Sequence, residues 1–184
     1  MKIIICKRKF VRLVLLLLLL SLALFWIPKA QYRMYPLKYN DIVTREAANC
    51  QMDKYLIFAI MKAESNFDYL AQSHKEAKGL MQITDETAFW CAEKMGMEDF
   101  NIGKIREPEY NIKIGTWYIR YLMNVYDECL VDALAAYNAG IGNVNSWMRQ
   151  DGITKLDIDQ IPFEETRQYV QKVLRYYEKC KKLY

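Results

Sequence analysis

The residue with the clearest capacity for acid–base chemistry is Glu64. It closes the strongly apolar segment KYLIFAIMKAE (54–64), so the last turn of a helix there is expected to pack against a core. A carboxyl group in that place loses hydration, and desolvation raises its pKa. A raised pKa keeps a proton available near neutral pH, which suits a general acid. By position alone, however, a helix-terminal glutamate that reaches solvent explains Glu64 more simply.

Three segments in a fixed order change that interpretation. The first is ESNFDYLAQSHKEAKGLMQITDETA (64–88), the second AYNAG (136–140) and the third IPFEETRQYV (161–170). Together they resemble the signature of the soluble lytic transglycosylases, the lysozyme-like enzymes that cleave peptidoglycan. The resemblance extends over about residues 38–180, and three ordered motifs are far more specific than GLMQI alone.

The resemblance implies roles for individual residues. Glu64 falls on the catalytic acid of the family. Its substrate-binding positions fall on Ser73, Gly79, Met81, Gln82, Tyr137, Asn138 and Glu165. Gly79 would let the chain turn sharply and come close to sugar, and Asn138 would hold the loop beside the glycan groove.

Several of these residues also have an ordinary structural explanation. Ser73 could be a turn residue, and Gln82 a hydrogen-bonding residue at a helix entry. Tyr137 could be a core aromatic whose hydroxyl is satisfied, and Glu165 could cap the last helix from its first turn. The sequence also departs from the family, because Thr84-Asp85 stands where members have methionine and proline, and Ile141 replaces a proline. These changes concern contacts with the sugar and not the reaction class.

The resemblance implies a mechanism with a single carboxyl group. Glu64 would protonate the β-1,4 bond between N-acetylmuramic acid and N-acetylglucosamine, then accept a proton from the muramoyl C6 hydroxyl to give a 1,6-anhydro end. It implies neither a metal nor an organic cofactor. The other acids nearby stand in polar loop or helix-start contexts typical of solvated surface: Asp68, Glu76, Asp85 and Glu86. Two alternatives stay open, a hydrolytic muramidase as in goose-type lysozymes and an inactive glycan-binding or scaffold module of an envelope-spanning machine.

Helices must position these residues, since the exported part shows no convincing alternating strand. Asp41, Asp53 and Thr84 are candidate starts of helices, and Pro108 suits the first turn of a long one. Further helices are expected at 131–138, 141–150 and 162–180, and 65–83 is expected to be irregular. The predicted fold is all-α, a lysozyme-like domain at 41–184 after a linker at 31–40.

The first 30 residues predict a targeting segment. Leu13 to Ile27 carries no charge, and the basic cluster KRKFVR (7–12) precedes it, as in a signal peptide or a signal anchor. Because no small-x-small cleavage site follows, we expect an uncleaved hydrophobic helix that anchors the chain in the membrane, with residues 1–12 in the cytosol and the domain outside. A cleaved signal peptide is the alternative, and the expected location is the bacterial cell envelope.

The net charge of +4 is uneven along the chain. Six of the 26 basic residues lie in 1–30, which has no acid, so the rest carries 20 basic and 22 acidic side chains. A nucleic-acid partner is therefore not expected, since such binding needs clustered Lys and Arg. The expected partners are glycan strands of peptidoglycan, the membrane and, in an assembly role, envelope machinery. Cys50, Cys91, Cys129 and Cys180 could form disulfides outside the cytosol or be small buried side chains.

Overall fold

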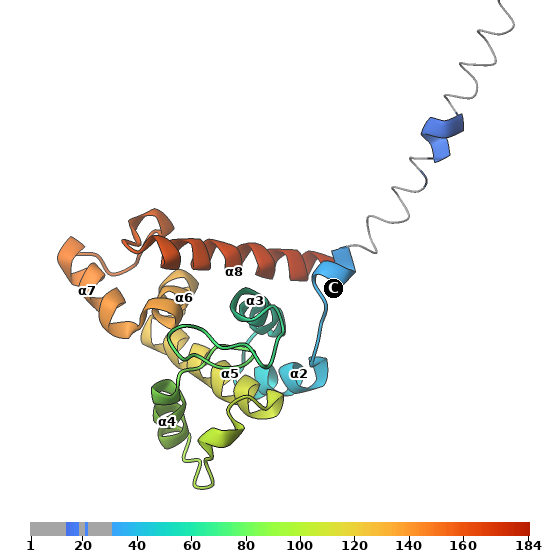
Figure 1. Cartoon of the computed structure of the whole chain (residues 1–184). Coiled ribbons are helices and arrows are strands. Elements are labelled where there is room, and N and C mark those ends of the chain that lie inside the picture. Colours follow the sequence, from blue (N-terminus) through green and yellow to red (C-terminus); the bar gives the residue numbers. More distant parts are fainter. Residues whose placement is uncertain (1–13, 19–20, 22–30) are drawn as a thin grey trace, which may run out of the picture. The chain divides into compact units, whose positions relative to one another are not determined.

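Helices form nearly all the regular structure of residues 14–18, 21 and 31–184, the part of the chain described by this computed structural model. The named elements of that part are, in chain order (Figure 1), α2 (Asn40–Asn49), α3 (Lys54–Glu64), α4 (Asp85–Lys94), the 3₁₀ helix η1 (Ile102–Lys104), α5 (Pro108–Val125), α6 (Leu130–Ala139), α7 (Ile141–Asp151), the 3₁₀ helix η2 (Ile158–Gln160) and α8 (Glu164–Leu183). Pairing of β type among these residues is limited to two isolated bridges, Gln72 with Lys78 and Lys78 with Ile83. The all-α prediction is confirmed.

Local chemistry sets the starts of helices α3, α4 and α5. The Asp53 side chain accepts a hydrogen bond from the backbone N–H of Tyr55, and Thr84 accepts one from Thr87, so both cap their helices as predicted. Pro108 occupies the first turn of α5. The prediction for Asp41 is wrong. Helix α2 already begins at Asn40, after Tyr39 in a left-handed conformation, and Asp41 lies within its first turn, where its charge still suits the helix dipole.

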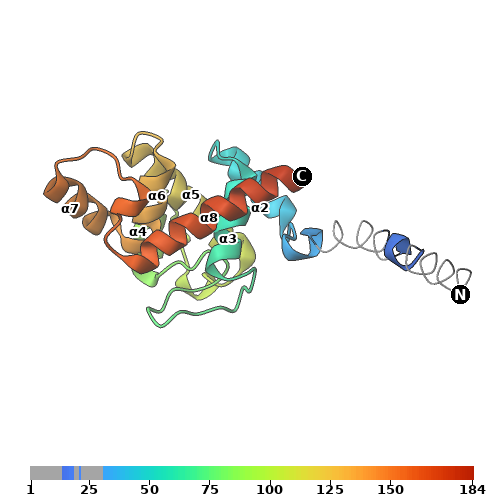
Figure 2. The ribbon, with the colours of Figure 1, turned by 90° about the horizontal axis from the view of Figure 1, so that it is seen from above.

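Helix α3 is the centre of the core. Its residues 56–61 are all buried, and five of them are completely so. Helix α5 packs against α2, α4 and α6, and α6 packs against α7. Helix α8 lies across α3 (Figures 1 and 2), where Lys172 donates to the carbonyl of Ala63 at 2.6 Å and the Tyr177 hydroxyl donates to Asp53 at 2.7 Å. This arrangement fixes the C-terminal end of α3, and with it Glu64, between the core and α8.

Residues 37–182 form one compact unit, distinct from the residues before them. Of the hydrophobic helix predicted at 13–27, the structure describes only 14–18 and 21, which are helical. The remainder of that prediction, and the basic cluster before it, lie outside the described residues. Within the described part of the chain, no helix has the length and apolar character needed to cross a membrane.

The four cysteines of this part are free thiols. Cys91 and Cys180 are buried, whereas Cys50 and Cys129 are half-buried. Burial raises the pKa of the Cys91 thiol to about 12. Cys91 and Cys180 therefore match the second interpretation, that of small buried side chains, and not that of disulfide partners.

Candidate active site

A cleft of about 330 Å³ opens at the C-terminal end of α3. Its walls come from the irregular segment after α3, the first turns of α4 and α8, the middle of α5 and the end of α6. The residues that line it are Glu64, Ser73, His74, Lys75, Ala77, Gln82, Ile83, Thr84, Thr87, Tyr118, Tyr137, Asn138, Ala139, Gly140 and Glu165. Segments separated by up to a hundred residues in the sequence therefore meet around one carboxyl group.

Glu64 is partly buried at the inner wall of this cleft. Burial, with a smaller contribution from the nearby Glu165 carboxylate, raises the pKa of its carboxyl group to about 7. Two groups of α8 act in the opposite direction: the Tyr169 hydroxyl and the positive charge of Lys172 both lower this pKa. Because burial is the largest of these influences, Glu64 can carry a proton close to neutral pH.

Sequence reasoning missed the contributions of Tyr169 and Lys172. Both lie on α8, three residues apart and so on one helical face. Tyr169 belongs to the third motif (161–170), and Lys172 follows the end of that motif by two residues. The Tyr169 hydroxyl is buried and makes no hydrogen bond of standard geometry within the described residues, and it lowers the pKa of the Glu64 carboxyl group. The available signal was their three-residue spacing at the end of the third motif.

The irregular segment 65–84 is held by hydrogen bonds to its own backbone and to α3. The Ser65 hydroxyl donates to the carbonyl of Leu80 at 2.9 Å, which ties the segment to the end of α3. The Gln82 side-chain amide donates to the carbonyl of Gly79 at 2.9 Å and to that of Ala71 at 3.2 Å. Gln82 itself has a positive φ of 49°, a conformation that these bonds help to maintain.

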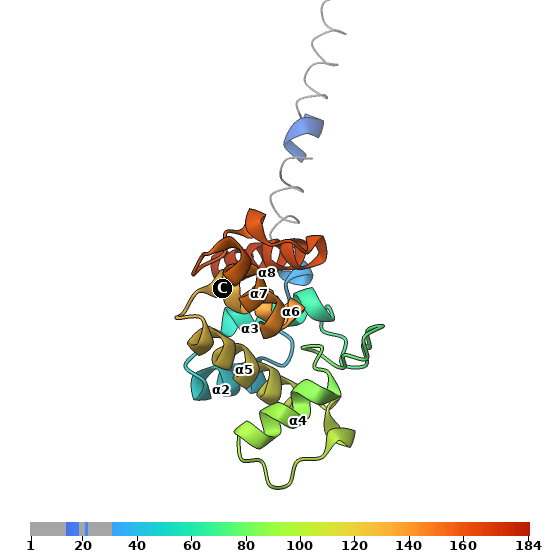
Figure 3. The ribbon, with the colours of Figure 1, turned by 90° about the vertical axis from the view of Figure 1, so that its left-hand side faces the viewer.

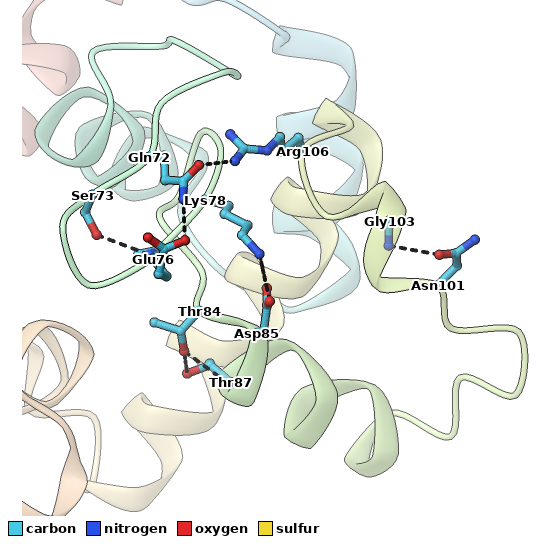
Figure 4. A network of polar contacts seen from close by, with 11 residues as sticks. Gln72, Ser73, Glu76, Lys78, Thr84, Asp85, Thr87, Asn101, Gly103 and Arg106 are labelled. Atoms are coloured by element: carbon cyan, nitrogen blue, oxygen red, sulfur yellow. Dashed lines mark hydrogen bonds and ion pairs between the residues drawn. The ribbon is translucent and has the colours of Figure 1, made fainter.

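Side-chain contacts brace the outer part of this segment against α4 (Figure 4). The Lys78 ammonium pairs with both carboxylate oxygens of Asp85 at 2.7 Å. Thr84, which caps α4, also exchanges a hydroxyl contact of 2.9 Å with Thr87. The two residues that replace the usual methionine and proline therefore have structural partners here, and Thr84 also lines the cleft.

Asn111 on α5 holds the segment from below, and sequence reasoning missed it too. Its side-chain oxygen accepts from the backbone N–H of Met81 at 2.7 Å, and its amide donates to the carbonyls of Lys78 (2.9 Å) and Ile105 (2.8 Å). Gly79, with φ 78°, runs so close that a Cβ atom there would stand 2.5 Å from the Asn111 amide nitrogen. The signal was a polar residue at an apolar position of the α5 period.

Six of the eight residues predicted for the site line the cleft: Glu64, Ser73, Gln82, Tyr137, Asn138 and Glu165. The other two do not. Met81 is completely buried, and its carbonyl accepts from the Tyr137 hydroxyl at 2.8 Å. Gly79 makes its close approach to Asn111 instead of lining the cleft. Both residues pack on the core side of the cleft wall and do not contact the cleft itself. Gly79 packs against Asn111, and the Met81 side chain is completely buried.

The structural alternatives for the lining residues are visible as well. The Ser73 hydroxyl accepts from the backbone N–H groups of Ala77 (3.1 Å) and Lys75 (3.2 Å), as a turn residue does. The Asn138 side chain accepts from the Thr166 hydroxyl at 2.8 Å, which joins the end of α6 to the start of α8. Glu165 is mostly exposed and lies 3.8 Å from the Lys75 ammonium. These bonds fix the side chains in the cleft wall and leave the exposed Glu165 carboxylate open to a ligand.

Comparison with known proteins identifies the family. Residues 41–159 match the family described as Transglycosylase SLT domain. The soluble lytic murein transglycosylase of Salmonella typhimurium is 37% identical over 148 residues, which are 77% of this chain and 23% of that protein. The membrane-bound lytic murein transglycosylase C of Salmonella arizonae is 32% identical over 161 residues, or 74% of this chain and 44% of that protein.

Solved structures agree with this result. The 70 kDa soluble lytic transglycosylase of Escherichia coli superposes with a TM-score of 0.77 at 32% identity, covering 83% of this chain and 25% of that one. An inactive variant of the lytic transglycosylase Slt of Pseudomonas aeruginosa, in which a glutamate is replaced by glutamine, gives 0.72 at 34% identity, covering 81% and 25%. The chain belongs to the transglycosylase SLT family and has its lysozyme-like helical fold. It spans about a quarter of the length of the soluble relatives it matches.

Proposed function

We propose that the chain is a peptidoglycan lytic transglycosylase with Glu64 as its only catalytic carboxyl group. The observation that carries this proposal is the Glu64 carboxyl in the cleft, with a pKa raised to about 7. The names of the soluble and membrane-bound relatives support the activity. The inactive glutamate-to-glutamine variant of the Pseudomonas protein supports a glutamate as the acid.

In the proposed reaction, the protonated Glu64 donates its proton to the oxygen of the β-1,4 bond between N-acetylmuramic acid and N-acetylglucosamine. The bond breaks, and an oxocarbenium-like state forms that the N-acetyl group of the substrate can stabilise. Glu64, now ionised, accepts the proton of the muramoyl C6 hydroxyl, whose oxygen bonds to C1. The product is a 1,6-anhydro end, and Glu64 returns to its protonated form.

Glu165 is the second carboxylate of the cleft, and its surroundings favour a binding role. Its side chain is 69% exposed and pairs with Lys75, so it is solvated and suited to accept hydrogen bonds from sugar hydroxyls. Ser73, Gln82, Tyr137 and Asn138 would complete the binding wall. The transglycosylase reaction requires this wall to hold the muramoyl C6 hydroxyl close to C1.

The proposal extends to the organisation and location of the chain. Residues 1–30 would form a basic tip and a signal anchor or signal peptide, 31–40 a linker, and 41–184 the catalytic domain in the cell envelope. Tethering would restrict cleavage to nearby wall and would suit service to an envelope-spanning assembly. Fractionation of the producing bacterium tests this. An anchored chain is expected in the membrane fraction and accessible to protease only from outside, whereas a chain with its signal peptide removed is expected outside the cytoplasm but not in the membrane fraction.

The activity is tested on purified peptidoglycan sacculi with the unmodified protein, Glu64→Gln and Glu165→Gln. Loss of the catalytic acid should reduce the rate by about 10²- to 10⁴-fold. Glu165→Gln should mainly raise KM. Full activity of Glu64→Gln would reject the assignment, and equal losses of kcat in both variants would indicate a two-carboxylate hydrolase instead.

A further inference from the structure

A row of aromatic side chains leads out of the cleft and has no part in the proposed reaction. Tyr137 and Tyr118 line the cleft, with ring centroids 5.4 Å apart. The Tyr118 ring lies 6.2 Å from that of Trp90, which is not in the cleft lining. Trp90 meets Tyr121 edge-on at 4.8 Å, and Tyr121 stacks on Trp117 at 5.7 Å. We call Tyr118, Trp90, Tyr121 and Trp117 the aromatic row.

Helix geometry explains why the row continues from the cleft. Thr87 lines the cleft and Trp90 follows it by three residues, so the two share one face of α4. Tyr118 and Tyr121 are related in the same way on α5. Because α4 packs against α5 (Figure 3), these two faces merge into one surface.

The row is accessible and rigid. All four of its side chains are half-buried, so part of each ring stays open to solvent beside the cleft. Each ring contacts at least one other ring of the row in a stacked, tilted or edge-on arrangement, so their orientations are already fixed. Little conformational entropy would be lost when a ligand packs on them. Such a surface suits a flat, partly apolar ligand.

The pyranose rings of a β-1,4-linked glycan have this character, because their axial C–H groups form apolar faces that pack on aromatic rings. Neighbouring rings of the row lie 6.2, 4.8 and 5.7 Å apart, so together they form a continuous aromatic surface. We propose that the aromatic row is a secondary glycan-binding surface that holds the stretch of a strand extending beyond the cleft. The proposal rests on the proposed function only in taking a glycan as the occupant of the cleft.

The experiment measures binding alone, in the full chain carrying Glu64→Gln, with β-1,4-linked N-acetylglucosamine trimer and octamer as probes. The octamer should bind more tightly than the trimer and should shift the tryptophan fluorescence. Replacing Trp90 and Trp117 by leucine should weaken octamer binding by about tenfold, the worth of two aromatic contacts, and leave trimer binding unchanged. Phe89→Leu is the matched control, because Phe89 is exposed on the same helix but its ring contacts Phe100.

Several outcomes would overturn the proposal. The first is that the chain with an intact row binds trimer and octamer with equal affinity. The second is that the double variant keeps its affinity for the octamer. The third is that Phe89→Leu weakens octamer binding as much as the double variant does. If the double variant is less stable, the proposal is tested by fluorescence in the chain that keeps Trp90 and Trp117. There the octamer should shift the tryptophan fluorescence and the trimer should not, and an equal shift with both probes would overturn the proposal. The two proposals can fail separately. If octamer binding depends on the tryptophans but the unmodified protein does not cleave sacculi, the aromatic row is supported as a glycan-binding surface and the proposed reaction is rejected.

Discussion

At the scale of the residue, the protonation of Glu64 has opposite consequences for activity and for stability. The proton that makes Glu64 a general acid is retained because burial penalises the ionised form. The same penalty falls on the folded protein whenever Glu64 is ionised. The carboxyl group that is useful in catalysis therefore lowers the stability of the folded protein when it is ionised. The pH dependence of stability and the pH dependence of activity both report on the surroundings of Glu64.

We expect Glu64→Gln to stabilise the protein at alkaline pH. The pKa rises from 4.5 to about 7 on folding, so between these values the folded state binds more protons and stability falls as pH increases. The amide of glutamine has no such penalty. The stability difference between Glu64→Gln and the unmodified protein should be about 3 kcal/mol larger at pH 8 than at pH 4. Chemical unfolding at both values measures it, and a difference independent of pH would contradict the raised pKa.

We expect Lys172→Met to move the pH profile of cleavage. The Lys172 charge lowers the pKa of Glu64, so its removal should raise that pKa and shift the alkaline fall of kcat/KM to higher pH. Lys172 also donates to the carbonyl of Ala63, and Lys172→Arg is the control that keeps both charge and donor. A profile that falls in height without shifting would show that Lys172 only supports the fold.

At the scale of the element, the cleft depends on how closely α5 approaches the segment behind the wall. Gly115 allows this approach, because a Cβ atom there would stand 2.5 Å from the sulfur of Met81 and 2.8 Å from its Cβ. Met81 in turn presents the carbonyl to which Tyr137 donates. The geometry of Tyr137 in the cleft thus rests on a glycine that does not touch it.

Two matched glycine substitutions test this packing. Gly115→Ala should destabilise the protein by about 1–3 kcal/mol, because it overfills the space held by Met81. Gly142→Ala places a methyl group in open space within α7, where alanine should be neutral or stabilise the helix by up to about 1 kcal/mol. Thermal melting compares them. Equal effects of the two would contradict the close approach of α5 to Met81.

The helices were largely predictable because their signals are local. Asp53, Thr84 and Pro108 mark helix starts through bonds or torsions within one turn. The prediction that Asp41 caps α2 was wrong because Asn40, one residue earlier, can also begin a helix. Only the path of the chain from Tyr39 decides between the two starts. The role of Asn111 could not be predicted from local signals, since its three hydrogen bonds reach residues up to 33 positions away in the sequence.

At the scale of the whole molecule, the fold gathers one acid, a polar wall and an aromatic surface from helices far apart in the sequence. The sequence motifs alone identify six residues that the fold brings to one cleft: Glu64, Ser73, Gln82, Tyr137, Asn138 and Glu165. The motifs do not reveal that Tyr169 and Lys172 adjust the acid, nor that Trp90 and Trp117 come together. Those relations depend on how α8 crosses α3 and how α4 meets α5.

The free thiols give a prediction for the folded chain as a whole. Cys50 and Cys129 are half-buried and should react with iodoacetamide before Cys91 and Cys180, which are buried and should react only on unfolding. The thermal midpoint should be the same with and without a reductant. Peptide mass mapping after short labelling identifies the modified sites. A midpoint lowered by the reductant would show a disulfide and contradict the free thiols.

The most direct test of the proposed reaction is the mass of the products released from peptidoglycan by the purified protein. If Glu64 acts as acid and then as base toward the muramoyl C6 hydroxyl, the products carry 1,6-anhydro ends, and Glu64→Gln releases none of them. Products heavier by one water would show hydrolysis and contradict the transglycosylase reaction. Anhydro products from Glu64→Gln at an undiminished rate would contradict the role of Glu64 itself.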